Sequence, residues 1–224
     1  MLGGQPIIIL KENVERNRGL EAQRSNIAAA KAIASAVRTT LGPRGMDKML
    51  VDQSGDVTIT NDGATILQDI SVVHPGAKMV IEVAKAQDDE VGDGTTTAVV
   101  MVGSLMEKAE AMIEKKIHPT VIAEGYRLGM KKALEVLDDL SIPIDPYDRE
   151  KLIRIADTAM TGKAIESVKS RLNGIVVDAV MAIATREGDR ITADEDNVLI
   201  KKQAGDRMDD AELVRGVVID KKRV

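Results

Sequence analysis

The residues Gly92-Asp93-Gly94-Thr95-Thr96-Thr97 lie between two long helical patterns and constrain the fold more than any other segment. Two flexible glycines make a tight turn there, and the turn opens directly into a helical segment. A helix N-terminus offers unpaired N–H groups and a partial positive charge, which suit a phosphate group. Asp93 adds a hard oxygen ligand of the kind that Mg²⁺ prefers. The segment therefore predicts a seat for phosphate and magnesium.

The same residues also suit a plain turn, because Asp-Gly is a common turn pair and Thr is a common helix N-cap. Both interpretations remain open on this segment alone. It is not a Walker A loop, since no Gly-Lys-Ser/Thr follows at the required spacing. It is a poor Rossmann fingerprint as well, since the segment before it is helical and polar rather than a buried strand.

The amino-acid composition limits which side chains can form the core and excludes several classes of function. The 224 residues are 44% apolar and include eleven Met and two Tyr, but no Phe, Trp or Cys. The core must therefore be aliphatic, with Met filling irregular gaps, and disulfides and thiolate metal sites are excluded. The net charge of −5 and the lack of aromatic side chains argue against nucleic-acid binding. The apolar run at 6–10 is too short to span a membrane, so we expect a soluble cytoplasmic protein with no membrane partner.

Hydrophobic periodicity predicts a mainly helical chain. The helical segments cover about 20–41, 64–70, 76–88, the turn at 92–97 to about 116, 119–139, 147–160 and 172–186. Short β-branched runs predict strands at 5–10, 49–51, 57–60, 197–201 and 213–219. In the helix over 76–88 we expect Met79, Val80, Val83 and Ala86 to face the core. Two prolines within 141–146 predict a stiff connection and a domain boundary.

Three further segments carry candidate chemistry. Residues 40–47 end a helix, and Gly42 has no Cβ to keep the backbone away from a flat ligand or a phosphate. Residues 60–65 put Asp62 before a helix, where its carboxylate is either an N-cap or a group that orients an attacking water. Lys163 lies beyond the proline-rich connection. Taken singly, these segments also fit a helix stop, a turn and a surface lysine.

Together and in this order, the segments resemble the group II chaperonins of the TCP-1/cpn60 superfamily, in particular those of archaea. Residues 37–50, 59–67 and 90–100 carry the resemblance, and His118-Pro119 and Thr161-Gly162-Lys163 agree with it. It implies a mainly α fold in three parts. These are the N-terminal half of an equatorial ATP-binding domain over 1–145, the first half of a small α/β intermediate hinge domain over 146–214, and the first strand of an apical domain over 215–224.

The resemblance also implies a site for ATP or ADP with Mg²⁺. Leu41, Gly42 and Pro43 would line the nucleotide, and Asp93 would hold Mg²⁺. Cofactor contacts, mainly to phosphates, would come from Gly63, Gly94, Thr95, Thr96 and Thr97. Asp62 would be catalytic by positioning the attacking water, and Lys163 would sense the γ-phosphate from the intermediate domain.

The function implied in this way is that of an ATP-dependent chaperone subunit. Such a subunit is an ATPase that works with other chaperonin subunits in a stacked double ring and drives the folding of unfolded client proteins. We expect the chain to be less than half of a family member, so a non-catalytic nucleotide-binding or assembly fragment is the alternative. A stand-alone phosphotransferase is a third hypothesis, disfavoured because Walker A and kinase signatures are absent.

Overall fold

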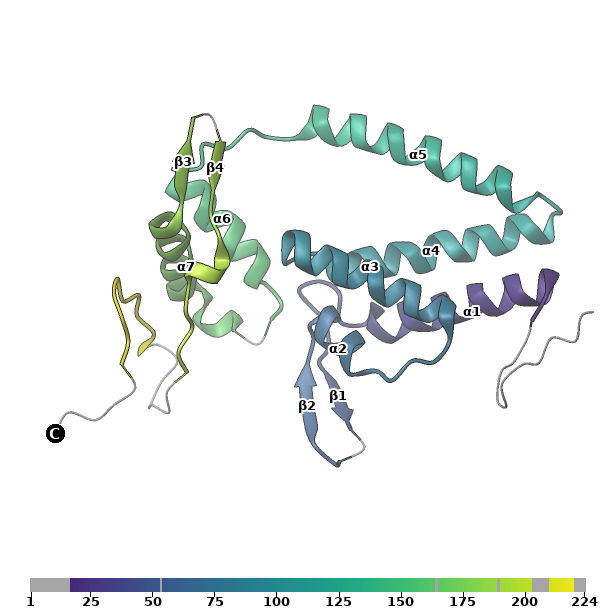
Figure 1. The fold of residues 1–224 in the computed structure, drawn as a ribbon, viewed down its shortest axis with the longest axis horizontal. Helices are drawn as coiled ribbons and strands as arrows, with labels where there is room; N and C mark the ends of the chain where they lie inside the picture. Colours follow the sequence, from purple (N-terminus) through teal and green to yellow (C-terminus); the bar gives the residue numbers. More distant parts are fainter. Residues whose placement is uncertain (1–16, 53, 164, 189, 203–209, 220–224) are drawn as a thin grey trace, which may run out of the picture.

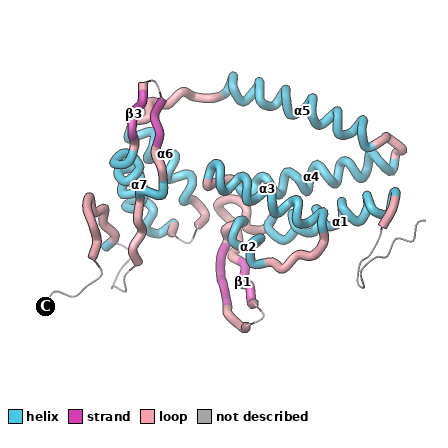
Figure 2. The backbone as a smooth tube through the Cα atoms, in the orientation of Figure 1, coloured by secondary structure: helices cyan, strands magenta, loops and turns pink. Residues whose placement is uncertain are grey.

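The computed structural model describes residues 17–52, 54–163, 165–188, 190–202 and 210–219. Within these ranges the chain forms seven α-helices and two short antiparallel hairpins (Figures 1 and 2). The mainly helical fold class is thus confirmed, whereas the strand expected at 5–10 lies outside the described residues. No helix in these ranges is both long enough and apolar enough to cross a bilayer.

Three helices form the core of the larger lobe: α1 (Gly19–Arg38), α3 (Pro75–Val91) and α4 (Thr95–Glu114). All three pack against one another, and α4 meets α1 where Gly103 faces Ala34. A Cβ added to Gly103 would overlap the Cβ of Ala34, so the missing side chain permits this close crossing. The buried cluster is aliphatic, as the composition requires: Ala30, Ile33, Ala34, Val37, Ile66, Leu67, Ala77, Val80, Ile81, Ala84 and Val99.

The short helix α2 (Gly63–Asp69) packs on this core and follows a hairpin. Strands β1 (Lys48–Val51) and β2 (Val57–Thr60) pair antiparallel, with Lys48 opposite Thr60. The hairpin extends away from the helices in Figure 1, and most of its apolar side chains are exposed. Because β2 leads into α2 through only two residues, the hairpin fixes the direction in which that helix begins.

Two helices begin at a His-Pro pair, in which the proline occupies a position where a helix needs no N–H. His74 Nδ1 accepts a hydrogen bond from the Gly76 N–H (3.1 Å), and its Nε2 lies 3.0 Å from the Ser25 hydroxyl oxygen of α1. At the start of α5 (Pro119–Leu140), His118 Nδ1 accepts from the Thr120 N–H (3.4 Å). Both histidines therefore cap helices.

Helix α5 runs back above α3 and α4 in Figure 1 and is the least buried of the long helices. Ile122 is its one buried residue, and the Tyr126 hydroxyl donates to the Leu105 carbonyl of α4 at 2.6 Å. Its exposed apolar side chains are Val121, Leu128, Met130, Leu134, Val136, Leu137 and Leu140. Among the described residues, no other element covers these side chains, which include the stripe of Met130, Leu134 and Leu137 on one face of α5.

The smaller lobe follows residues 141–148, which form neither helix nor strand. Its helices α6 (Arg149–Met160) and α7 (Lys169–Ile183) are joined by Arg149, which donates from Nε to Asp178 Oδ1 (2.8 Å) and from Nη2 to Oδ2 (3.1 Å). The remaining elements are η1 (Glu166–Val168), β3 (Thr185–Glu187), β4 (Arg190–Thr192) and η2 (Glu195–Asn197). The break at 141–148 coincides with the expected connection, and the three-domain division stays a prediction.

The strands expected at 197–201 and 213–219 were wrong, because the structure has no strand in either segment. A strand is stable only beside neighbours that pair its backbone and cover one face, and no described strand lies next to these segments. The sequence patterns also do not reveal the hairpin β3–β4, whose strands have three residues each. The helix expected over 172–186 therefore stops at Ile183.

The expected inward face of α3 was also wrong at three of its four residues. The buried residues are Ala77, Val80, Ile81 and Ala84, while Met79, Val83 and Ala86 are exposed. Both sets have helical spacing, so periodicity alone does not select one face. Burying the set with two alanines lets α3 lie close to α1 and α4.

Candidate functional site

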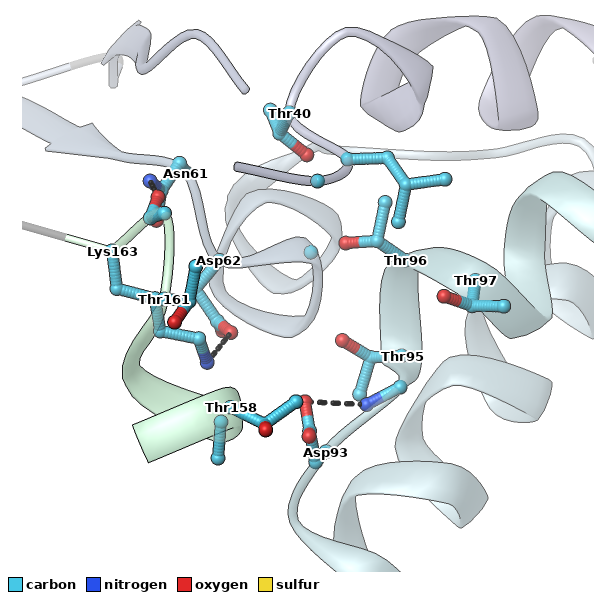
Figure 3. Close-up of a pocket in the computed structure, with 16 residues that line it drawn as sticks. Thr40, Asn61, Asp62, Asp93, Thr95, Thr96, Thr97, Thr158, Thr161 and Lys163 are labelled. Atoms are coloured by element: carbon cyan, nitrogen blue, oxygen red, sulfur yellow. Dashed lines mark hydrogen bonds and ion pairs between the residues drawn. The ribbon is translucent and has the colours of Figure 1, made fainter. Parts of the chain in front are cut away.

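A pocket lies where the start of α4, the start of α2 and the residues after α6 meet (Figure 3). Its lining comes from four stretches of the chain: 40–42, 61–63, 93–97, and 158–159 with 161–163. Its volume of about 120 Å³ is smaller than the ~300–1,000 Å³ of pockets that enclose a whole small ligand. The pocket therefore has room for a phosphate group rather than for an entire nucleotide.

The N-terminus of α4 forms one wall of the pocket. Gly92 and Gly94 both have left-handed backbone conformations (φ 70° and 79°), which glycine adopts without strain. Ala98 donates the first backbone hydrogen bond of the helix, to the Gly94 carbonyl (2.9 Å), and no described side chain caps this end. The N–H groups of 95–97 thus stay available at the positive end of a helix of 20 residues.

Asp93 lies in the turn before α4, with its position set by two hydrogen bonds. Its Oδ1 accepts from the Gly94 N–H (2.8 Å), and its backbone carbonyl accepts from Gln87 Nε2 (2.8 Å). No group of three or more acidic, His or Cys side chains that could hold a metal occurs in the described part of the chain. Mg²⁺ is usually held by one or two carboxylates together with substrate phosphates, so Asp93 fits a phosphate-dependent ion and not a protein-only cage.

Asp62 is the N-cap of α2, and its two oxygens have different neighbours. Oδ2 accepts from both the N–H and the hydroxyl of Thr65 (3.0 Å each). Oδ1 faces the Lys163 ammonium, 3.7 Å from Nζ (Figure 3). One oxygen therefore holds the helix start, while the other is directed across the pocket.

Gly63 lets the starts of α2 and α4 come together. A Cβ on Gly63 would overlap the Thr96 hydroxyl oxygen and lie 3.1 Å from the Thr96 backbone nitrogen. The absence of that atom lets the threonines of α4 approach the start of α2, although residues 64–94 separate Gly63 from Thr95 in the chain. Thr95 is buried there, and Thr96 and Thr97 line the same wall.

The loop after α1 supplies another part of the lining. Gly42 has φ 85°, and its carbonyl accepts from the Gly45 N–H at 2.9 Å. Leu41 and Gly42 line the pocket, whereas Pro43, which was expected to line the nucleotide, does not. Pro43 instead lies beside Gly162, whose added Cβ would be 3.1 Å from the Pro43 Cα.

The structure brings the other predicted residues together: Leu41, Gly42, Asp62, Gly63, Asp93, Gly94, Thr95, Thr96, Thr97 and Lys163 all line the pocket. It adds Thr40, Asn61, Thr158, Ala159, Thr161 and Gly162, for which the sequence alone indicated no individual role. Four of these six residues lie within the segments 40–47, 60–65 and 161–163, so the motifs around them were a usable signal. Thr158 and Ala159 lie inside α6 and carry no local signal of their own.

A sequence model of the TCP-1/cpn60 chaperonin family matches residues 33–224. That match covers most of the chain, and the chain belongs to this family.

Its relatives include thermosome subunits of archaea. Thermosome subunit alpha of Archaeoglobus fulgidus is 55% identical over 223 residues, which are 100% of this chain and 41% of that protein. A thermosome subunit of Methanopyrus kandleri is 54% identical (99% and 41%), and thermosome subunit 1 of Haloferax volcanii is 53% identical (100% and 39%). The chain thus spans about two fifths of these relatives' length, in their N-terminal part.

Proposed function

We propose that the pocket binds the phosphates of ATP or ADP together with Mg²⁺. The observation that carries this proposal is the convergence of four distant stretches on the uncapped N-terminus of α4. Such a helix start binds phosphate through its free N–H groups and its dipole. Membership of the chaperonin family supports the same assignment.

The residues divide into roles by their position in the pocket. The backbone of 94–97 and the hydroxyls of Thr95, Thr96 and Thr97 bind phosphate oxygens, and Gly63 keeps this wall open. Leu41, Gly42 and Pro43 form the nucleotide side of the site, with Pro43 acting from behind the lining. Asp93 holds Mg²⁺, which supplies positive charge for the phosphate oxygens when it is bound.

Asp62 and Lys163 are the groups suited to hydrolysis. Phosphoryl transfer relies on positioning the nucleophile and on stabilising charge, with little covalent chemistry by the protein. The Asp62 Oδ1 carboxylate oxygen, directed across the pocket, accepts a proton from an attacking water or orients it. Lys163 Nζ lies 3.7 Å from that oxygen, and its positive charge binds the γ-phosphate.

In the whole protein, we propose that this ATPase activity drives the folding of non-native client proteins in the cytoplasm. The subunits assemble with other chaperonin subunits into a stacked double ring. This part of the proposal rests on family membership, because the chain spans about two fifths of its relatives.

The second candidate is a non-catalytic nucleotide-binding or assembly fragment. The small volume of the pocket and the uncovered apolar face of α5 favour it, since both suggest a site and a core that further chain completes. In this case the chain associates through its exposed surfaces and hydrolyses little or no ATP.

Calorimetric titration of the chain with ATP, with and without Mg²⁺, followed by a phosphate-release assay, separates the two candidates. Asp93→Asn keeps an oxygen acceptor for the Gly94 N–H but removes the charge, so it should abolish the Mg²⁺-dependent part of the affinity. Asp89→Asn, on the exposed side of α3, is the matched control. Absence of nucleotide binding, or binding indifferent to Asp93→Asn, would contradict the proposal. Binding without phosphate release would favour the second candidate.

A further inference from the structure

Residues 161–163 are held against the pocket by a contact that is distinct from the Asp62–Lys163 ion pair. Asn61 Nδ2 donates a hydrogen bond to the backbone carbonyl of Gly162 at 2.6 Å, across 101 residues of sequence. The contact is partly buried and joins the β2–α2 junction of the larger lobe to the end of α6 in the smaller lobe. This hydrogen bond therefore connects the two lobes directly at the pocket.

The backbone of Gly162 also packs closely on the loop after α1. An added Cβ on Gly162 would lie 2.8 Å from the Gly42 carbonyl oxygen and 3.1 Å from the Pro43 Cα. The φ angle of Gly162 is +79°, a conformation that favours glycine. Residues 161–163 are thus held on one side by the Asn61 amide and on the other by the 42–43 backbone.

The ion pair is the weaker of the two attachments. Lys163 Nζ and Asp62 Oδ1 are 3.7 Å apart, beyond hydrogen-bond distance, and their side chains are 41% and 36% exposed. Exposed ion pairs of this kind contribute little, because solvent screens them and two side chains must be ordered. A phosphate carries more charge than one carboxylate and competes well for the same ammonium group.

We propose that Asn61 is the positioning residue that anchors 161–163 and so keeps Lys163 within reach of both Asp62 and the phosphate that the proposed function assigns to the pocket. The neutral Asn61–Gly162 hydrogen bond persists when Lys163 exchanges Asp62 for that phosphate, because it involves none of the charges that change partner. Asn61 and Asp62 are consecutive, so one short segment holds the backbone of 161–163 and also faces its lysine. The exchange step rests on the proposed nucleotide site, whereas the anchor does not.

The anchor is tested without nucleotide by residue-specific amide exchange measured by NMR on the chain. The Thr161 and Lys163 N–H groups bond to the Thr158 and Met160 carbonyls, so their exchange reports on the end of α6. We expect Asn61→Ala and the isosteric Asn61→Asp to speed exchange there roughly fivefold, the effect of losing one net hydrogen bond. Lys163→Ala should leave the Thr161 rate within about twofold of the wild type.

Amides of α1 and α4 serve as the internal control, and they should be unchanged in every variant that folds normally. Unchanged exchange at Thr161 in the Asn61 variants would overturn the proposal. An equal increase of the Thr161 exchange rate in Lys163→Ala would also overturn the proposal, because the ion pair would then be the contact that holds residues 161–163.

A steric variant tests the same anchor from the other side. Gly162→Ala must move away from the Gly42 carbonyl, and it should speed exchange at Thr161 as the Asn61 variants do. Gly188→Ala is the matched control, since Gly188 also has a positive φ (+64°) but open space around its missing Cβ. If Gly162→Ala and Gly188→Ala changed the Thr161 exchange rate equally, the close packing of Gly162 would not be what holds residues 161–163.

The exchange step is tested by the ratio of ATP to ADP affinity in the presence of Mg²⁺. Lys163→Ala should reduce the preference for ATP, Asn61→Ala should reduce it as well, and the double variant should be no worse than Lys163→Ala alone. Additive losses, or an Asn61→Ala ratio equal to that of the wild type, would overturn the step. Absence of nucleotide binding by the wild type would defeat the proposed function and this step, while the amide-exchange result would still decide the anchor.

Discussion

The carboxylate of Asp62 performs two separate tasks with its two oxygens. Oδ2 caps α2 through Thr65, and Oδ1 faces Lys163 across the pocket. A capping residue needs only an acceptor atom, which Asn also supplies, whereas the task in the pocket needs a negative charge. The two tasks can therefore be separated by choosing the right substitution.

We predict that Asp62→Asn keeps the stability of the chain and that Asp62→Ala lowers it by about 1 kcal/mol, the usual cost of losing an N-cap. Thermal unfolding of the two variants checks this difference.

Both variants should bind ATP. In an assembled chaperonin that carries them, both should release phosphate roughly 100-fold more slowly or worse, because the positioned carboxylate is gone. Wild-type turnover in Asp62→Asn would remove this carboxylate from the mechanism.

At the scale of elements, the packing of the larger lobe depends on how closely α4 approaches α1. Gly103 lies at their crossing, where its missing side chain leaves no spare volume beside Ala34. Gly129 lies within α5 with open space around it. Because both glycines lie within helices, replacing either one by alanine changes the helix propensity by a similar amount. The two substitutions therefore differ mainly in how well the added methyl group can be packed.

We predict that Gly103→Ala destabilises the chain by roughly 1–3 kcal/mol, the usual cost of overpacking a core. Gly129→Ala should instead be neutral or stabilising by up to about 1 kcal/mol, because alanine favours a helix. Urea unfolding of both variants gives the comparison. Adding Ala34→Gly to Gly103→Ala should restore part of the lost stability, and failure of this rescue would argue against the crossing described above.

The smaller lobe has an electrostatic attachment that depends on pH. The two hydrogen bonds from Arg149 lower the pKa of Asp178 from its ordinary value of 3.8, and the charges of Arg149 and Arg215 act in the same direction. A lowered folded-state pKa contributes stability above 3.8, and that contribution disappears as the pH falls through the folded-state value.

We therefore predict that Asp178→Asn is less stable than the wild type at neutral pH and that this difference vanishes well below pH 3.8. The effect is small, because both side chains are more than two fifths exposed. Thermal melts followed from pH 7 downward measure it. Glu187→Gln, a surface carboxyl of β3 outside this pair, is the control. A difference that is the same at every pH would contradict the electrostatic origin.

At the scale of the whole molecule, two apolar surfaces of the described structure have no covering element. One is the face of α5 that includes Leu134 and Leu137, and the other is the β1–β2 hairpin. Contiguous exposed apolar surface of this kind is uncommon on monomers and marks an interaction surface or an aggregation site.

We predict that the 24.1 kDa chain self-associates as its concentration rises, and that Leu134→Gln with Leu137→Gln weakens this association. Sedimentation velocity over a concentration series measures it. Glu135→Gln with Asp138→Asn, on the same helix, is the control for introducing amides into α5. A chain that stays monomeric at high concentration would show that these surfaces do not drive association.

Much of the local structure was predictable from the sequence. The helices up to α6 and the hairpin β1–β2 agree with periodicity to within a few residues, because a helix or a tight hairpin is specified by side chains near in sequence. The glycine turn before α4 was predictable for the same reason. The strands expected at 197–201 and 213–219 failed because pairing depends on a distant partner.

Among the residues that line the pocket, those within a recognisable motif were predicted from the sequence, and those without one were not. Asp62, Asp93 and the threonines of α4 follow from their own segments. Thr158 lines the pocket because α6 ends beside it, and Pro43 lies outside the lining, next to Gly162.

By itself, the sequence determined where α4 begins and which residues precede it, and it left both a phosphate seat and a plain turn open for this segment. The tertiary structure alone decided that Asn61 would meet Gly162 and that Lys163 would face Asp62, about 100 residues away. The physical reason is that a helix start is specified by local backbone geometry. A contact between lobes depends instead on how closely whole elements pack, here through glycines whose missing side chains matter only once their neighbours are in place.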